Sequence, residues 1–187
     1  MFKIQSKSSI RNSLYPDATT SRFPSAEAEK LEVKPPSLYN YITGLDDARR
    51  QLAHFALEKL ETALRDTALG YTRTDALRKI AYAYRHFAQC RPELYKAFIV
   101  CPSFDDAGIG EAKQAVARTF YQVLEPYQLD HEMKIHFTRC FRSALHGFVS
   151  LESTGFFKNG VDAEKSFETL IETSLAPLVQ RRGRGKK

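Results

Sequence analysis

The chain has 187 residues, 43% of them hydrophobic, which is enough for one domain with a buried core, or for such a domain with a small head. Its formal net charge is +6, but five of the 28 basic residues lie in the last seven positions, and the other 23 nearly balance the 22 acidic ones. The three cysteines show no paired spacing, and no apolar run has the form of a signal peptide or a membrane span. We therefore expect a cytoplasmic protein with a nearly neutral body and a basic tail at 181–187.

The N-terminal quarter divides into two parts. Residues 1–24 have only Ile10 and Leu14 as an apolar pair at helical spacing, which predicts a divergent or disordered leader. Residues 25–46 begin with a short helix capped by Ser25 and continue, after a three-residue turn, with a second helix that starts at Pro35. Two short helices joined in this way predict a partial helix-turn-helix.

Residues 47–180 show apolar side chains at helical spacing throughout, and no segment alternates as a strand would. Caps and breakers divide this region into six helices. They run from Asp46 to Gly70, from Thr74 to Ala88, from Pro92 to Ile99, up to Pro126, from Asp130 onwards and from Asp162 onwards. The pattern predicts an all-α fold.

Two separated segments resemble one known family. The stretch Leu31–Asp46 resembles the second half of the helix-turn-helix of tetracycline-repressor (TetR) regulators, and Arg142–Glu152 resembles the C-terminal ligand and dimerisation domain called the WHG domain. The segments Tyr82–Ala88 and Arg91–Tyr95 fit the same domain. The likeness covers about residues 28–180, and it implies a TetR-like helical bundle with a partial helix-turn-helix head.

The resemblance implies a ligand-responsive transcriptional regulator, in particular a repressor. Such proteins are homodimers that bind operator DNA and release it when the body takes up a small-molecule inducer. The head departs from the family pattern, since residues 1–24 show no counterpart of its first helix, and Glu27 and Glu32 replace an aliphatic residue and a glycine. We therefore keep a second hypothesis, a ligand-binding dimerisation protein that has lost DNA binding, and a third, weaker one, a helical enzyme. A frameshifted or misplaced start would explain the leader.

The DNA contacts are expected at the start of the second head helix, where such helices face the bases and phosphates. These residues are Lys34, Pro36, Ser37, Tyr39, Asn40 and Tyr41. The alternative is that they are surface groups of a vestigial head.

An aromatic pocket with a few polar groups is expected in the body, as small-molecule sites require. Its candidate residues are Tyr82, Arg85, His86, Tyr95, Phe98, Phe120, His136, Phe137 and His146. For any single one of them, ordinary core packing is the simpler interpretation.

A dimer face is expected on the last two helices, where apolar residues gather. Its candidates are Phe148, Leu151, Phe156, Phe167, Leu170, Ile171 and Leu175. The alternative is that these stripes are buried within one subunit.

No cofactor, metal or catalytic residue is predicted. The pairs His86–Cys90 and His136–Cys140 have i, i+4 spacing, which would allow a zinc site between two helices, but this spacing also arises by chance. No phosphate loop or hydrolase motif is present.

Overall fold

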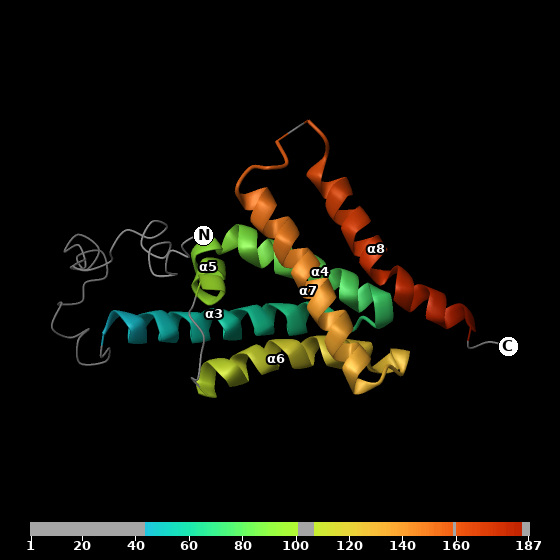
Figure 1. Ribbon diagram of the computed structural model, residues 1–187, viewed down its shortest axis with the longest axis horizontal. Helices are drawn as coiled ribbons and strands as arrows, with labels where there is room; N and C mark the ends of the chain where they lie inside the picture. Colours follow the sequence, from blue (N-terminus) through green and yellow to red (C-terminus); the bar gives the residue numbers. More distant parts are fainter. Residues whose placement is uncertain (1–43, 101–106, 159, 185–187) are drawn as a thin grey trace, which may run out of the picture. The chain divides into compact units, whose positions relative to one another are not determined.

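The computed structural model describes residues 44–100, 107–158 and 160–184 (Figure 1). The chain divides at Leu45 into two units, and the fold described below is that of the second, Asp46–Lys187. The predicted leader, the predicted head up to residue 43 and all six candidate DNA contacts lie outside the described residues. Cys101 and the last three residues of the basic tail lie outside them too.

The first three helices of the body follow the predicted punctuation. Helix α3 spans Leu45–Ala68, with two aspartates in its first turn, and ends before Gly70, which has a φ of +80°. Helix α4 spans Arg73–Cys90 and helix α5 spans Pro92–Val100. A proline opens α5 because its missing N–H costs nothing in a first helical turn. The predicted helices are confirmed, and α4 begins slightly earlier than expected, after an extended Thr72.

The second half of the body is also helical. Helix α6 spans Ala107–Leu124 and continues into a short 3₁₀ turn, η1, at Glu125–Tyr127, which contains the predicted breaker proline. Helix α7 spans His131–Ser153, and Asp130 caps it by accepting a hydrogen bond of 2.7 Å from the backbone N–H of Met133. Helix α8 spans Ala163–Arg184. Within the described ranges there is no strand, as predicted.

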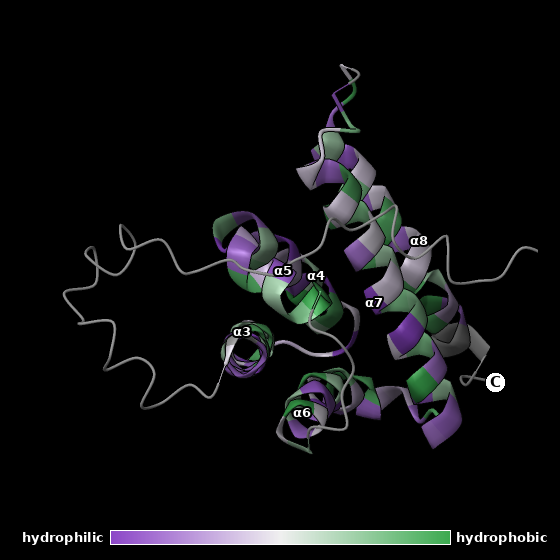
Figure 2. Ribbon diagram, turned by 60° about the vertical axis from the view of Figure 1, so that its left-hand side comes forward, coloured by the Kyte–Doolittle hydropathy of each residue, from purple (hydrophilic) through white to green (hydrophobic). Residues whose placement is uncertain are grey.

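Helix α4 is the central element of the bundle. It packs against α5, α6, α7 and α8, and the ribbon views show it surrounded by them (Figures 1 and 2). Its apolar stripe, predicted from spacing alone, is buried as expected; Leu77, Ile80 and Ala81 are each fully inaccessible. One helix that touches four others can connect a change on one side of the bundle to the other side.

Apolar spacing predicts a buried stripe on α3 that includes Leu52, Phe55, Ala56 and Leu60, and this prediction is partly wrong. Leu52 and Phe55 are 46% and 45% exposed, whereas their neighbours Ala53 and Leu57 are buried. The sequence carries apolar residues on more than one face of this helix, so periodicity did not decide which row would enter the core. The core takes the row that continues through Leu60.

In the described helices, none has the length and apolar character needed to cross a membrane.

Candidate ligand site and the adjacent helix junction

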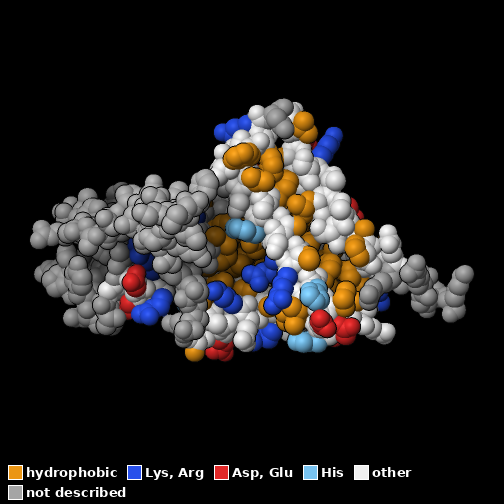
Figure 3. Space-filling model, viewed as in Figure 1, with side chains coloured by type: hydrophobic (Ala, Val, Ile, Leu, Met, Phe, Trp, Pro, Cys, Tyr) orange, Lys and Arg blue, Asp and Glu red, His pale blue; other side chains and the backbone are white. Residues whose placement is uncertain are grey.

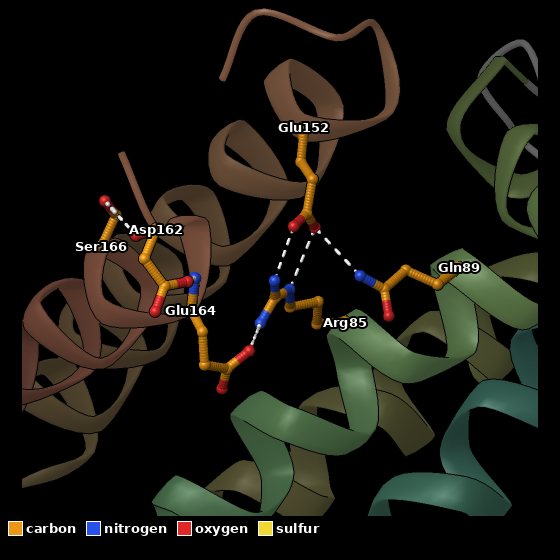
Figure 4. A network of polar contacts seen from close by, with 6 residues as sticks. All are labelled: Arg85, Gln89, Glu152, Asp162, Glu164 and Ser166. Atoms are coloured by element: carbon orange, nitrogen blue, oxygen red, sulfur yellow. Dashed lines mark hydrogen bonds and ion pairs between the residues drawn. The ribbon is translucent and has the colours of Figure 1, made fainter. Parts of the chain in front are cut away.

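Arg85 lies at the junction of α4 with the facing ends of α7 and α8 (Figure 4). Its Nε and Nη2 groups donate to the two carboxylate oxygens of Glu152, at 3.0 and 2.6 Å, and its Nη1 donates to Glu164 at 2.6 Å. The residue is only 9% exposed. A planar guanidinium suits this arrangement because two parallel bonds to one carboxylate fix direction as well as distance.

Local sequence places the two acidic partners. Glu152 lies in the last turn of α7, and Glu164 lies in the first turn of α8, where a negative charge is favoured by the helix dipole. Asp162 accepts a hydrogen bond of 2.9 Å from the backbone N–H of Glu164, which fixes the start of α8. Gln89, one turn after Arg85 on α4, also donates to Glu152 at 3.2 Å. The hydrogen bonds that Arg85 donates to Glu152 raise the pKa of Arg85, so the cation is held charged.

Two aromatic rings cover the same cation. The guanidinium carbon of Arg85 lies 4.7 Å from the centre of the Phe167 ring and 5.6 Å from that of Phe148. Phe148 and Phe167 also touch each other, with centroids 4.9 Å apart. The junction therefore joins α4, α7 and α8 through charge, hydrogen bonds and ring faces together.

A chain of three polar side chains crosses the interior on the other side of α4. The hydroxyls of Tyr84 on α4 and Tyr95 on α5 lie 3.3 Å apart, and the Tyr95 hydroxyl lies 2.5 Å from Nδ1 of His146 on α7. Phe98 packs edge-on against Tyr95, with centroids 5.2 Å apart. Burial raises the pKa of both tyrosines, so both hydroxyls stay protonated at neutral pH.

Helix α7 brings two further polar side chains into this region. Thr138 and Arg142 precede His146 by eight and four residues, so the three form one i, i+4 row along the helix. Burial lowers the pKa of His146, and the positive charge of Arg142 lowers it further. The Nε of Arg142 and the hydroxyl of Thr138 are both buried without a hydrogen-bond partner, and Thr138 is only 3% exposed. Buried donors without partners are costly and point to a missing acceptor.

The predicted pocket residues are distributed over four places. Tyr95, Phe98 and His146 meet in the cluster just described. Phe120 and Phe137 pack on either side of Phe141, at 6.3 and 5.6 Å between centroids. Phe120 is fully buried, so ordinary core packing accounts for it.

The remaining candidates lie elsewhere. Tyr82, Arg85 and His86 line an open groove of about 690 Å³ beside α3 and α4. His136 has a 57% exposed side chain next to Glu132 and is not among the residues gathered around Tyr95. Sequence reasoning missed Tyr84, Thr138 and Arg142; the i, i+4 spacing of polar residues on α7 was the one available signal.

The predicted dimer face is corrected in part. Phe148, Phe167, Ile171 and Leu175 are between 0 and 7% exposed, so they belong to the core of the single subunit. Phe167, Ile171 and Leu175 are buried because this row of α8 faces α4 and α7, and Phe148 of α7 packs against Phe167. Leu151 and Phe156 remain exposed, at 44% and 74%, and Leu170 is partly buried.

The two histidine–cysteine pairs do not gather into a metal site in the described residues, where no group of three possible ligands occurs. The Sγ of Cys90 lies 3.6 Å from both ring nitrogens of His86, a contact that the helical spacing alone produces.

Comparison with known proteins agrees with this architecture. The crystal structure of SCO4313, a protein described as regulatory, superimposes with a TM-score of 0.67 at 23% identity, covering 82% of this chain and 84% of that one. At this identity the likeness concerns the fold alone.

The sequence comparisons are more specific. A family model described as the tetracyclin repressor-like C-terminal domain matches residues 77–174. The chain is 35% identical over 161 residues to Rv0681 of Mycobacterium tuberculosis, covering 86% of this chain and 73% of that protein, and 32% identical over 154 residues to YobS of Bacillus subtilis, covering 82% and 80%. Both relatives are described as uncharacterized HTH-type transcriptional regulators. The chain belongs to the tetracycline-repressor-like family of transcriptional regulators.

Proposed function

We propose that this chain is a DNA-binding transcriptional regulator, a repressor whose hold on its operator is released by a small molecule bound in the helical body. The observation that carries the ligand response is the polar cluster beside α4. Arg142 places a buried, unpartnered Nε one helical turn before His146, the partner of Tyr95, and Thr138 places a buried, unpartnered hydroxyl one turn earlier still. Unpartnered donors are destabilising in a merely structural core, whereas a binding site uses them when its ligand arrives.

Helix α4 supplies a route from that cluster to the rest of the body. Tyr84 belongs to the cluster and Arg85, the next residue, belongs to the junction with α7 and α8. Consecutive residues of a helix move together, so a shift of α4 that follows ligand binding also moves Arg85 against Glu152. This coupling requires two arrangements of one element that ligand and DNA favour differently.

The DNA-reading residues are proposed from the family resemblance. They are Lys34, Pro36, Ser37, Tyr39, Asn40 and Tyr41. Such regulators act where the chromosome lies, which for this chain means the cytoplasm, and no catalytic step is part of the proposal. A dimer presents two reading helices to successive turns of DNA, about 34–36 Å apart.

The subunit contact is proposed at the exposed apolar side chains of the last two helices and their connection. These include Leu151, Phe156, Val161 and Val179, which are between 44% and 74% exposed. Large apolar side chains exposed on a surface favour association.

A gel-shift titration of the full chain tests the proposal. The probe is the DNA on either side of its own coding sequence, with a shuffled duplex of equal length as the control. We expect one specific site whose affinity falls steeply as salt rises, because phosphate contacts release counterions. Tyr39→Ala should weaken that binding with little change in sequence preference. Failure to bind either flank would favour the ligand-binding protein that has lost DNA binding.

A further inference from the structure

We propose that the ligand of the body is an organic acid, held by its carboxylate at Arg142 of α7, with the polar side chains of Thr138 and His146 one turn to either side. The ligand class adds to the proposed function. The release of DNA by this ligand rests on that function, whereas the binding of the acid does not.

The charge of Arg142 is uncompensated within the described residues. Arg85 of α4 and Arg142 of α7 both have buried guanidinium nitrogen atoms, but only one of them has acidic partners. Arg85 is neutralised by Glu152 and Glu164, at 2.6 Å each. Arg142 forms no ion pair with any described carboxylate, although its Nε is fully buried. The buried Nε needs a hydrogen-bond acceptor, since a donor withdrawn from water without a partner is unfavourable.

The polar side chains one turn before and one turn after Arg142 can act as hydrogen-bond donors. Thr138, one turn earlier on α7, has a hydroxyl that is buried and unpartnered. His146, one turn later, has its Nδ1 next to the Tyr95 hydroxyl, and if that hydroxyl donates, the proton of the neutral ring is on Nε2. Guanidinium, threonine hydroxyl and Nε2–H are then three donors in one helical row. A row of donors with no acid among them matches an oxyanion, and a carboxylate fits the fork of an arginine.

The row on α7 is accessible to solvent and has an aromatic neighbour. Arg142 and His146 are partly exposed, so the row can be reached from solvent. Figure 3 shows one face of the molecule, on which hydrophobic side chains lie among Lys, Arg and His side chains. The ring of Tyr95 adjoins His146, and Phe98 packs against Tyr95. An acid with an apolar body, rather than a sugar phosphate or another highly polar anion, suits these surroundings.

Isothermal titration calorimetry on the full chain tests the class of ligand. The probes are monocarboxylates of increasing apolar size (acetate, butanoate, octanoate, benzoate and phenylacetate), each compared with its primary amide. We expect at least one of the larger acids to bind and its amide to bind about tenfold more weakly, because the amide cannot form the charged pair. If no acid binds, or if amide and acid bind equally, the proposal is overturned.

Three variants place the site. Arg142→Gln should weaken the best acid about tenfold or more, and Thr138→Val should weaken it by less. Arg139→Gln is the matched control, because it removes the same charge from an exposed position of the same helix. Circular dichroism of each variant confirms folding, and Arg142→Lys should restore part of the affinity if Arg142→Gln proves unstable. Equal losses from Arg139→Gln and Arg142→Gln would contradict the site.

The gel shift separates this inference from the proposed function. Acid binding that depends on Arg142, with no DNA binding, would contradict the regulator and leave the acid site standing. DNA binding without acid binding would contradict the acid site and leave the regulator standing.

Discussion

Arg85 and Glu152 form a two-bond ion pair that joins the middle of the bundle to the end of α7, at 2.6 and 3.0 Å. The two residues are 67 positions apart in the chain. The arginine also reaches Glu164 at the start of α8, so a single side chain fixes both ends of the α7–α8 connection to α4. We regard this junction as the part of the body that sets the mutual position of its last two helices.

Removing the carboxylate of this pair should destabilise the fold. Glu152→Gln leaves the buried Arg85 with one acidic partner instead of two, and we expect the free energy of unfolding to fall by about 2–3 kcal/mol. Urea denaturation followed by circular dichroism measures it. The matched control is Glu93→Gln, which breaks an exposed pair with Lys96. That change should cost less than about 0.5 kcal/mol. Similar losses for the two variants would contradict the structural role of the junction.

The Tyr95 hydroxyl should contribute measurably to stability and to the position of His146. Tyr95→Phe removes the group between Tyr84 and His146 and leaves both without that partner. We expect a loss of about 1–2 kcal/mol in the free energy of unfolding. The ring resonances of His146 in NMR spectra should also shift. Tyr121→Phe, on a half-buried ring of α6 for which no such hydroxyl contact is seen, should be nearly neutral. An unaltered His146 spectrum in Tyr95→Phe would argue against the hydrogen bond.

The pH dependence of stability should carry a contribution from His146. Burial and the charge of Arg142 hold its pKa in the folded state below the ordinary value of 6.5. The unfolded chain therefore takes up this proton first as the pH falls. Stability from this group is complete above pH 6.5 and is lost as the pH drops through the folded pKa.

Thermal unfolding between neutral and mildly acidic pH measures this effect. His146→Gln should make the midpoint less sensitive to acid in that window, whereas His136→Gln, at an exposed position of the same helix, should retain the profile of the wild type. A profile of His146→Gln that overlays the wild type would count against the assignment.

Core and subunit contact should separate cleanly in two phenylalanine variants. Phe167 is fully buried against Tyr82, Phe148 and Arg85, so Phe167→Ala should cost about 3–5 kcal/mol of unfolding free energy. Phe156 is 74% exposed, so Phe156→Ala should leave the subunit's stability nearly unchanged and weaken its self-association. Sedimentation equilibrium measures the second effect. A monomeric wild type at micromolar concentration would rule out the proposed contact.

Much of the fold follows from local sequence. Asp130 caps α7 and Pro92 opens α5 at the places where capping rules put them. Spacing also identified the buried stripe of α4. These features depend on residues within one or two turns of each other, which is the range over which periodicity carries information. Periodicity failed on α3, where Leu52 and Phe55 are exposed whereas Ala53 and Leu57 are buried.

The sequence by itself determined that the body is helical, where most of its helices begin, and which family it resembles. Only the tertiary structure decided which polar side chains are satisfied. Arg85 and Arg142 look alike in the sequence, yet one meets carboxylates 67 and 79 positions away and the other meets none in the described chain. Helix packing sets such pairings, because partners so distant in sequence are brought together by the burial of other residues and not by any local pattern.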